Sequence, residues 1–303
     1  MRAASVVIAR LLPLLPRTVV WAVGRRYIAG ANIEDALRCA EQFATRGILT
    51  TLDVLGEFVT QWVYAQQYAM QAEAVLEAIA QRRLPAYLSV KLTALGVDID
   101  PGESYRLLQN LVRRAQQLRL FVRIDMENSP YTDLTLAFYR RLREEGCENV
   151  GIVIQAYLRR SEADIEELLP LRPAVRLCKG AYIESPRIAY RAREEIRHQY
   201  KRLLELLLSH GLHTAIATHD EELLRFAEDA LQRYAVPLER YEFQMLLGVR
   251  PQRREYLRQQ GHPVRVYIPF GENWYGYSLR RIRENPNIVA HVLRALWRAD
   301  REW

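Results

Sequence analysis

Eight short apolar segments, each followed by a stretch with helical periodicity, constrain the fold of this chain more than any other feature. They are continuous apolar runs, which are typical of parallel strands covered on both faces. Eight strands alternating with helices predict an α/β protein closed into a (β/α)8 barrel. A doubly wound open sheet is the alternative, although no Gly-x-Gly-x-x-Gly follows the first segment. The segments are 48–55, 87–92, 121–126, 151–157, 175–180, 213–218, 241–247 and 264–269.

Several of the intervening helices have readable starts. Short polar residues accept hydrogen bonds from the first free N–H groups of a helix, and proline is well tolerated at its first position. Ser or Thr followed three residues later by an acidic residue forms a capping box. On these grounds we predict helix starts at Asn32, Asp100-Pro101, Ser129-Pro130 and the capping box Ser161-x-x-Asp164.

The first 28 residues are apolar but are interrupted by Arg10, Arg17, Arg25 and Arg26 and by two prolines. The uncharged run 11–16 is far too short to span a bilayer. A signal peptide is also a poor match, because Arg10 falls inside the apolar region and no small-residue cleavage site follows. We therefore divide the chain into an N-terminal helical arm, 1–45, and a barrel, 46–303. The arm packs on the barrel or lies on a membrane surface, and packing is favoured.

The net charge of +7 and the pI near 9.4 raise the question of nucleic acid binding. The arginines are spread along the chain and interleaved with acidic residues, which is typical of solvated helix faces, so we expect no nucleic acid partner. The three cysteines are well separated and indicate neither a disulfide framework nor a metal site. A reducing compartment fits this cysteine usage.

Only three of the 43 basic residues are lysines. Lys201 falls in the middle of a predicted helix and is interpreted as a surface residue. Lys91 and Lys179 fall at the ends of predicted strands, where a compact ammonium differs chemically from a guanidinium. Because barrel enzymes carry their chemistry at the carboxyl ends of the strands, we expect a cation-rich mouth that binds an anion. If the segment after the last strand is helical, one side of it presents Tyr277, Arg280, Arg281 and Glu284.

The motifs at the strand ends resemble those of bacterial monofunctional proline dehydrogenases, from about residue 27 to residue 287. Each motif is moderately specific, and their number and order make the resemblance strong. The matching segments are Asp53-Val-Leu-Gly-Glu57, Ser89-Val-Lys-Leu-Thr93, Arg123-Ile-Asp-Met-Glu127, Gln155-Ala-Tyr157, Arg176-Leu-Cys-Lys-Gly-Ala-Tyr182, Ala217-Thr-His219, Glu242-Phe-Gln-Met-Leu246, Arg265-Val-Tyr-Ile-Pro269 and Tyr277-Ser-Leu-Arg-Arg281 with Glu284.

The resemblance implies a distorted (β/α)8 TIM barrel that binds FAD and oxidises L-proline to Δ1-pyrroline-5-carboxylate. A hydride would pass from proline C5 to flavin N5, and the electrons would go to a membrane quinone, ubiquinone or menaquinone. The product would pass to a pyrroline-5-carboxylate (glutamate semialdehyde) dehydrogenase. The implied location is the bacterial cytoplasm, with peripheral association at the inner face of the membrane.

The resemblance also implies roles for individual residues. Lys91, Arg280 and Arg281 would hold the substrate carboxylate, and two guanidiniums with an ammonium suit that task chemically. Tyr267 and Tyr277 would pack on the substrate ring and complete the catalytic set, with Tyr182 and Leu246 closing the pocket. Glu57 and Arg280 would form a gate. No metal is implied. The expected FAD contacts are Asp125, Gln155, Arg176, Lys179, Gly180, Ala181, Thr218, His219, Gln244, Arg281 and Glu284.

Two positions depart from the family pattern. Ile183 stands where an aromatic residue is expected near the flavin, and Leu247 replaces a more polar or aromatic residue. Tyr267 is the residue that implies a preference for proline over hydroxyproline. Two other functions stay open on sequence alone: a Schiff-base aldolase that uses Lys91 or Lys179, and a basic nucleic-acid-binding protein.

Overall fold

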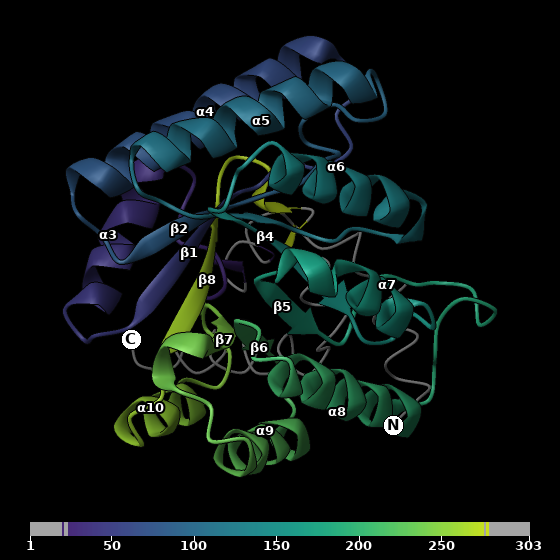
Figure 1. Cartoon of the computed structure of the whole chain (residues 1–303). Helices are drawn as coiled ribbons and strands as arrows, with labels where there is room; N and C mark the ends of the chain where they lie inside the picture. Colours follow the sequence, from purple (N-terminus) through teal and green to yellow (C-terminus); the bar gives the residue numbers. More distant parts are fainter. Residues whose placement is uncertain (1–19, 21–23, 276, 279–303) are drawn as a thin grey trace.

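Eight parallel strands close into a barrel in sequence order, which confirms the predicted fold and excludes the open sheet (Figure 1). The computed structural model describes residues 20, 24–275 and 277–278. Each predicted apolar segment overlaps one strand, with ends that agree to within two residues, and β8 also pairs with β1 to close the barrel. The strands are β1 Leu49–Val54, β2 Ala86–Val90, β3 Val122–Ile124, β4 Val150–Gln155, β5 Val175–Cys178, β6 Thr214–Ala217, β7 Tyr241–Leu246 and β8 Val264–Phe270.

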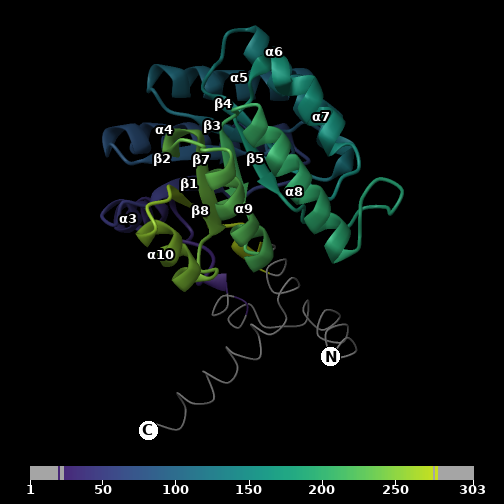
Figure 2. The ribbon, with the colours of Figure 1, turned by 60° about the horizontal axis from the view of Figure 1, so that its bottom comes forward.

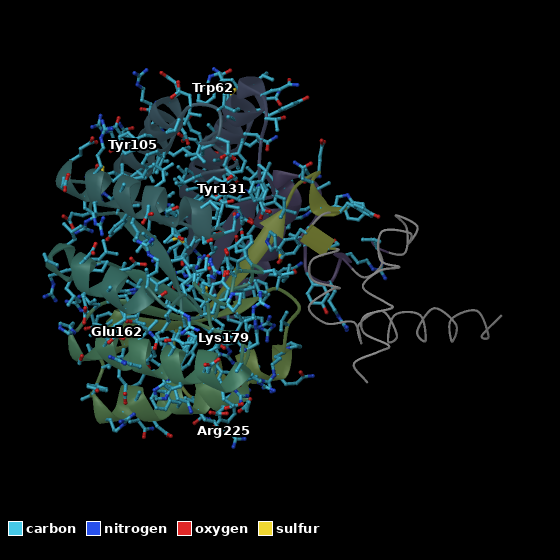
Figure 3. All side chains as sticks on the ribbon, turned by 90° about the vertical axis from the view of Figure 1, so that its right-hand side faces the viewer. Trp62, Tyr105, Tyr131, Glu162, Lys179 and Arg225 are labelled. Carbon is cyan, nitrogen blue, oxygen red and sulfur yellow. The ribbon has the colours of Figure 1, made fainter. Side chains whose placement is uncertain are left out.

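A ring of helices surrounds the strands, as two views of the chain show (Figures 1 and 2). Trp62 and Tyr105 lie on one side of the molecule and Arg225 on the other, with Lys179 between them (Figure 3). Short 3-10 turns precede or follow several elements, at Ser129–Tyr131, Leu169–Leu171 and Leu238–Arg240. The helices are α3 Ile33–Ala44, α4 Trp62–Gln81, α5 Pro101–Gln117, α6 Thr132–Glu144, α7 Ser161–Leu168, α8 Arg193–Ser209, α9 Glu221–Arg233 and α10 Pro251–Gln259.

Two of the four predicted helix starts are confirmed. The Asn32 side chain accepts from the backbone N–H of Asp35 at 2.9 Å, and Asp100 caps α5 with Pro101 in its first turn. At the other two sites a helix begins within three residues of the serine, but the predicted capping role was wrong, because each serine hydroxyl has a partner elsewhere. Ser129 lies in a 3-10 turn before α6 and donates to Glu184 at 2.8 Å. Ser161 is already the first residue of α7 and donates to the carbonyl of Gln155 at 2.6 Å.

Helix α3, which falls within the predicted arm, packs into the same apolar core as the barrel. Its buried residues Ala36, Leu37, Ala40 and Phe43 belong to the cluster that contains Leu52 of β1. Residues 1–19 and 21–23 of the predicted arm lie outside the described residues. Within the described part of the chain, no helix has both the length and the apolarity to cross a membrane.

The two faces of the strands differ in chemistry. Side chains alternate between the faces of a strand, and the buried apolar cluster contains one alternate set, including Leu88, Ile152 and Phe243. The other set carries the charged side chains of the strands. Its members bond across the barrel between strands that are not neighbours: Arg176 of β5 donates to the Tyr87 hydroxyl of β2. The apolar core therefore lies between strands and helices, and the barrel interior is filled by a polar network.

Candidate active site

A cavity of about 850 Å³ opens at the carboxyl ends of the strands, where the sequence predicted the site. This is an ordinary size for a pocket that binds a small molecule. Every predicted site residue within the described part of the chain lines it. Three predicted residues, Arg280, Arg281 and Glu284, lie outside the described residues. The predicted residues that line the cavity are Glu57, Lys91, Asp125, Gln155, Arg176, Lys179, Gly180, Ala181, Tyr182, Thr218, His219, Gln244, Leu246, Tyr267 and Tyr277.

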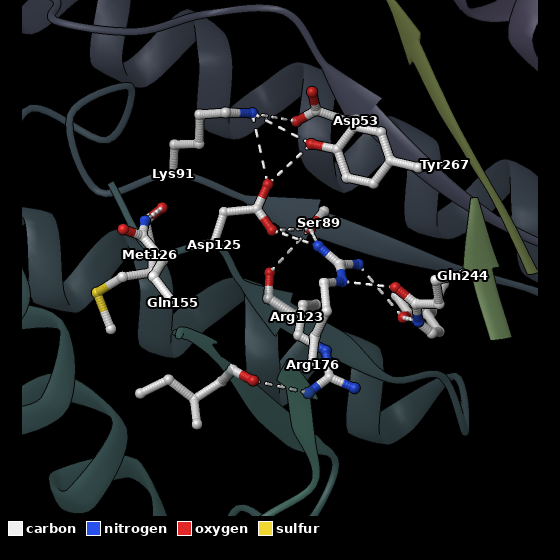
Figure 4. A network of polar contacts seen from close by, with 12 residues as sticks. Asp53, Ser89, Lys91, Arg123, Asp125, Met126, Gln155, Arg176, Gln244 and Tyr267 are labelled. Atoms are coloured by element: carbon white, nitrogen blue, oxygen red, sulfur yellow. Dashed lines mark hydrogen bonds and ion pairs between the residues drawn. The ribbon is translucent and has the colours of Figure 1, made fainter. Parts of the chain in front are cut away.

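Lys91 lies among acidic and phenolic groups at the bottom of the cavity (Figure 4). Its Nζ donates to Asp53 Oδ1 at 2.7 Å and lies 3.6 Å from Asp125 Oδ2. It also lies 3.4 Å from the Tyr267 hydroxyl, which donates to Asp125 Oδ2 at 2.8 Å. Strands β1 and β8 and the residues that follow β2 and β3 thus bring four side chains to one point.

Burial and ion pairing oppose each other in this cluster. Burial lowers the pKa of Lys91, but Asp53, Tyr267 and Asp125 raise it well above the usual value, so the side chain stays an ammonium. Burial raises the pKa of Asp53 to about 6, against the lowering effect of Lys91. Asp125 is also buried, yet Arg176 and Lys91 lower its pKa. The Lys91 ammonium is therefore held at a fixed place between two carboxylates at the bottom of the cavity.

Arg176 lies on the other side of Asp125 and is held from three directions. Its Nη1 donates to Asp125 Oδ1 at 2.6 Å, its Nε to Gln244 Oε1 at 2.6 Å, and its Nη2 to the Tyr87 hydroxyl at 3.3 Å. Its Cζ lies 5.2 Å from the ring centroid of Tyr267. Burial works against the charged guanidinium, but Tyr87 and Asp125 raise its pKa above the usual range. The guanidinium is therefore a fixed cation in the wall of the cavity.

A second charged group borders the cavity beyond β5 and β6. Asp220, the N-cap of α9, accepts from Lys179 Nζ at 3.2 Å and from Arg197 Nη2 at 2.8 Å. These partners lower the pKa of Asp220 far below its usual value, although burial alone would raise it. Next to it, His219 Nε2 accepts from the backbone N–H of Leu246 at 3.0 Å, so the proton of the neutral ring is on Nδ1.

Gln155 offers an unsatisfied acceptor in the buried wall of the cavity. Its Nε2 donates to the carbonyls of Met126 at 2.9 Å and Glu127 at 3.1 Å, which fixes the direction of the amide. Its Oε1 is buried and has no partner among the described residues. A buried acceptor of this kind is costly to leave unpaired, so the position suits a ligand N–H donor.

The loop after β5 brings Tyr182 to the cavity and is fixed by neighbouring segments. Glu184 accepts from the Ser129 backbone N–H at 2.7 Å, and Tyr190 donates its backbone N–H to the Tyr157 carbonyl at 2.8 Å. At Gly180, φ is +105°, and an added Cβ would lie 2.2 Å from the Tyr157 ring. The family departure Ile183 is 98% exposed and does not line the cavity.

Several cavity residues were absent from the predicted site. Asp53 and Asp220 carry charges that pair with predicted residues, Arg193 lies 3.6 Å from Asp220, and Cys178 adds to the lining. The sequence held a signal for each acid: Asp53 is a charged residue inside the first apolar segment, and Asp220 precedes two further acids at the start of an amphipathic helix. Lys201, interpreted as a surface residue, lies on α8 and pairs with Glu222 at 2.6 Å.

Comparisons with known proteins agree with this geometry. A family model described as proline dehydrogenase matches residues 36–293. Proline dehydrogenase 1 of Bacillus subtilis (strain 168) is 37% identical over 272 residues, which are 90% of this chain and 90% of the relative. The proline dehydrogenase of Deinococcus radiodurans is 35% identical over 286 residues, covering 93% of this chain and 92% of the relative.

A solved structure shares the fold. The crystal structure of proline utilization A (PutA) from Bdellovibrio bacteriovorus, inactivated by N-propargylglycine, matches with a TM-score of 0.81 and 26% identity. The match covers 87% of this chain and 32% of that one, so this chain spans about a third of the length of PutA. Together with the match to the family model and to full-length relatives, this places the chain in the proline dehydrogenase family.

Proposed function

We propose that this chain oxidises L-proline to Δ1-pyrroline-5-carboxylate with FAD as its cofactor. The observation that carries the proposal is the group Lys91, Asp125, Tyr267 and Arg176 at the bottom of the cavity, in a member of this family. The group offers one cation to a substrate carboxylate and one to a redox cofactor, with an aromatic ring between them. Such an arrangement fits a small amino acid held against a flat ring system.

The cavity wall suits FAD. The buried Oε1 of Gln155 fits an N–H donor of the flavin ring, and Lys179 and Arg176 supply positive charge. The further residues that we assign to the cofactor are Asp125, Gly180, Ala181, Thr218, His219, Gln244, Arg281 and Glu284. When bound, FAD would supply the two-electron oxidant for removal of a hydride from proline C5. The protein residues supply binding, orientation and electrostatics.

Lys91 and the two arginines Arg280 and Arg281 hold the proline carboxylate in this proposal. A carboxylate removed from water needs charge-assisted donors, and these three cations provide them. Tyr267, Tyr277, Tyr182 and Leu246 enclose the ring. Fixing the carboxylate orients the ring, so that C5 faces the cofactor, which is a contribution of positioning.

The proline nitrogen must be unprotonated for its lone pair to assist the loss of hydride. We assign removal of that proton to solvent, before Glu57 and Arg280 close the mouth of the cavity. The pair forms a gate with two states, because Arg280 binds either the substrate carboxylate or Glu57.

We further propose that the electrons pass to a membrane quinone, ubiquinone or menaquinone. Contact with a quinone requires peripheral association with the inner face of the membrane from the cytoplasm. The product is then consumed by a pyrroline-5-carboxylate (glutamate semialdehyde) dehydrogenase.

The state of Lys91 argues against a Schiff-base aldolase. A nucleophilic lysine must lose its proton near neutral pH, and enzymes achieve this by lowering the lysine pKa. The acidic neighbours of Lys91 raise it instead.

The test is anaerobic reduction of the purified holoenzyme by its substrate. We expect yellow protein whose visible flavin absorbance bleaches on addition of L-proline under argon, and D-proline is the matched control. Colourless protein that is trapped by borohydride with a carbonyl compound would favour the aldolase. Arg281→Met is the companion variant: it should raise the KM for proline strongly while the FAD content per protein stays close to that of the wild type. An unchanged KM would contradict the assigned carboxylate site.

A further inference from the structure

In the wall of the cavity, the Gln244 side chain lies between the guanidinium of Arg176 and the carboxylate of Glu242. Its Oε1 accepts from Arg176 Nε at 2.6 Å, and its Nε2 donates to Glu242 Oε1 at 2.5 Å. Nε2 also lies 2.7 Å from the Tyr87 hydroxyl, which accepts from Arg176 Nη2 as well. All four side chains are buried. They form a continuous chain of hydrogen bonds from the lower barrel interior to the cavity wall (Figure 4 shows its upper part).

The donors and acceptors give this chain one direction. An ionised carboxylate only accepts, so the Gln244 amide must turn its NH₂ group toward Glu242 and its oxygen toward Arg176. The Tyr87 hydroxyl does not impose this direction, because it can either donate or accept. A charged acceptor below the amide also polarises it and strengthens its oxygen as an acceptor for the guanidinium above.

Glu242 is itself held in the ionised state at a fixed place. Arg265 Nε lies 2.9 Å from each of its carboxylate oxygens, and Arg265 Nη1 donates to the Thr50 carbonyl at 2.6 Å. Burial raises the pKa of Glu242, but the pair with Arg265 outweighs burial and the pKa is lowered overall. Neither Glu242 nor Arg265 lines the cavity, so neither reaches a bound substrate directly.

We propose that Glu242 is a positioning residue for Arg176, acting through the Gln244 amide. It fixes the amide with its oxygen toward the cavity, and this oxygen holds the Nε edge of the guanidinium while Asp125 holds Nη1. In its contribution to the reaction, this inference rests on the proposed function, which places Arg176 against the redox cofactor. The hydrogen-bond relay itself does not depend on that function.

The test compares three variants of the full chain. Glu242→Leu removes the acceptor below Gln244. The double variant Glu242→Gln with Gln244→Glu exchanges the two side chains, so that the carboxylate stands at position 244, where it accepts from Arg176 directly. Glu228→Gln changes an acid that pairs with Arg253 outside the cavity and is the control. The readout without substrate is the ¹⁵N–¹H resonance of Arg176 Nε, assigned by its loss in Arg176→Lys.

We expect Glu242→Leu to shift or broaden the Arg176 resonance. In the holoenzyme, kcat per bound flavin should fall about tenfold, the rate equivalent of one hydrogen bond, while the KM for proline stays within about twofold. The double variant should restore the resonance, and Glu228→Gln should leave it unchanged. A wild-type resonance in Glu242→Leu overturns the inference. If Glu242→Leu does not fold, the double variant decides, because loss of the resonance there shows that a carboxylate below Arg176 is not what holds it.

The two proposals fail separately. Protein that binds no flavin but shows the expected change in the Arg176 resonance contradicts the proposed function and supports the relay. Protein that is bleached by proline but shows no change in that resonance supports the function and contradicts the relay.

Discussion

The two faces of the barrel strands solve opposite physical problems. Their outer faces carry residues such as Leu88, Ile152 and Phe243, which pack against the helices and are stabilised by removal of apolar area from water. Their inner faces carry Arg176, Asp125 and their neighbours, where burial opposes the charge of every group. Usual barrels of this type fill the interior with branched apolar side chains. Here the outer layer supplies stability, and the interior is reserved for chemistry.

The buried charged groups of the interior depend on one another for their stability. Lys91 and Arg176 share Asp125, and Asp125 also accepts from Tyr267 and from Ser89 at 2.7 Å. Removing one member leaves the others buried without their partner, which costs more than the pair contributes. In the outer layer, in contrast, a truncated side chain leaves only a cavity, whose cost is set by its volume.

Asp125→Ala should have the largest effect. It removes the carboxylate between two buried cations, so we expect the free energy of unfolding to fall by about 3–5 kcal/mol. Urea denaturation measures this change. The control is Asp133→Ala, whose side chain is 83% exposed and pairs with Arg160 on the surface; it should change stability by less than about 1 kcal/mol. Equal losses in the two variants would contradict the view that the interior charges depend on one another.

Leu76→Ala tests the outer layer. Leu76 lies on α4 and is fully buried, so we expect a loss of about 2–5 kcal/mol from the transfer and cavity terms. The activity per folded molecule should stay unchanged, because the side chain belongs to the core between helices and strands. Met70→Ala on the same helix is the control, since Met70 is 70% exposed. A large fall in kcat with unchanged stability would contradict the assignment of stability to the outer layer and of chemistry to the interior.

Much of the fold was predictable, because each strand lies in an apolar segment bounded by helices with clear periodicity. The prediction of continuous apolar runs nevertheless missed the alternation of polar and apolar side chains within the strands. In β7, the sequence Tyr-Glu-Phe-Gln-Met-Leu places Glu242 and Gln244 on one face and Phe243 and Met245 on the other. The signal was present, but it reads as an amphipathic strand whose polar face looks outward. Closure of the barrel turns that face inward, and closure is a property of the whole chain.

A predicted N-cap was wrong where another residue forms a hydrogen bond with the capping side chain. The Ser129 and Ser161 hydroxyls have the chemistry of N-caps, yet Glu184 and the Gln155 carbonyl engage them. The side chains of Asn32 and Asp100 accept from the first backbone N–H groups of α3 and α5 and cap these helices as predicted. The position of the site at the strand ends followed from the fold. The pairing of Asp53 with Lys91 did not, because it depends on the register between β1 and β2.

Glu127→Gln should change how the free energy of unfolding depends on pH. Glu127 is 1% exposed and accepts from the Thr93 backbone N–H at 3.0 Å. Burial raises its pKa from 4.5 to about 7, against the hydrogen bonds from Thr93. The folded chain therefore binds this proton more tightly than the unfolded chain, so stability falls as pH rises between these values and is level above them. Gln removes this dependence and keeps both bonds with Thr93.

We expect the variant to match the wild type in stability near pH 4.5 and to exceed it by about 3 kcal/mol above pH 7, as follows from the size of the shift. Urea denaturation at a series of pH values measures the difference. Glu222→Gln is the control, because Lys201 lowers the pKa of this exposed acid instead of raising it. A difference that is constant from pH 4.5 to pH 8 would mean that Glu127 is ionised throughout.

The smallest expected effect belongs to Asn32→Ala, at the start of α3. The substitution frees the backbone N–H of Asp35, which now donates to the Asn32 side chain at 2.9 Å, and loss of such a cap costs about 1 kcal/mol. The effect on stability should appear in full, because α3 packs into the core shared with β1. Asn32→Ser retains an acceptor and should recover most of the loss. The contrary outcome is that Asn32→Ala leaves the stability unchanged while Leu76→Ala lowers it. In that case α3 does not unfold together with α4 and the strands, and it is not part of the outer layer.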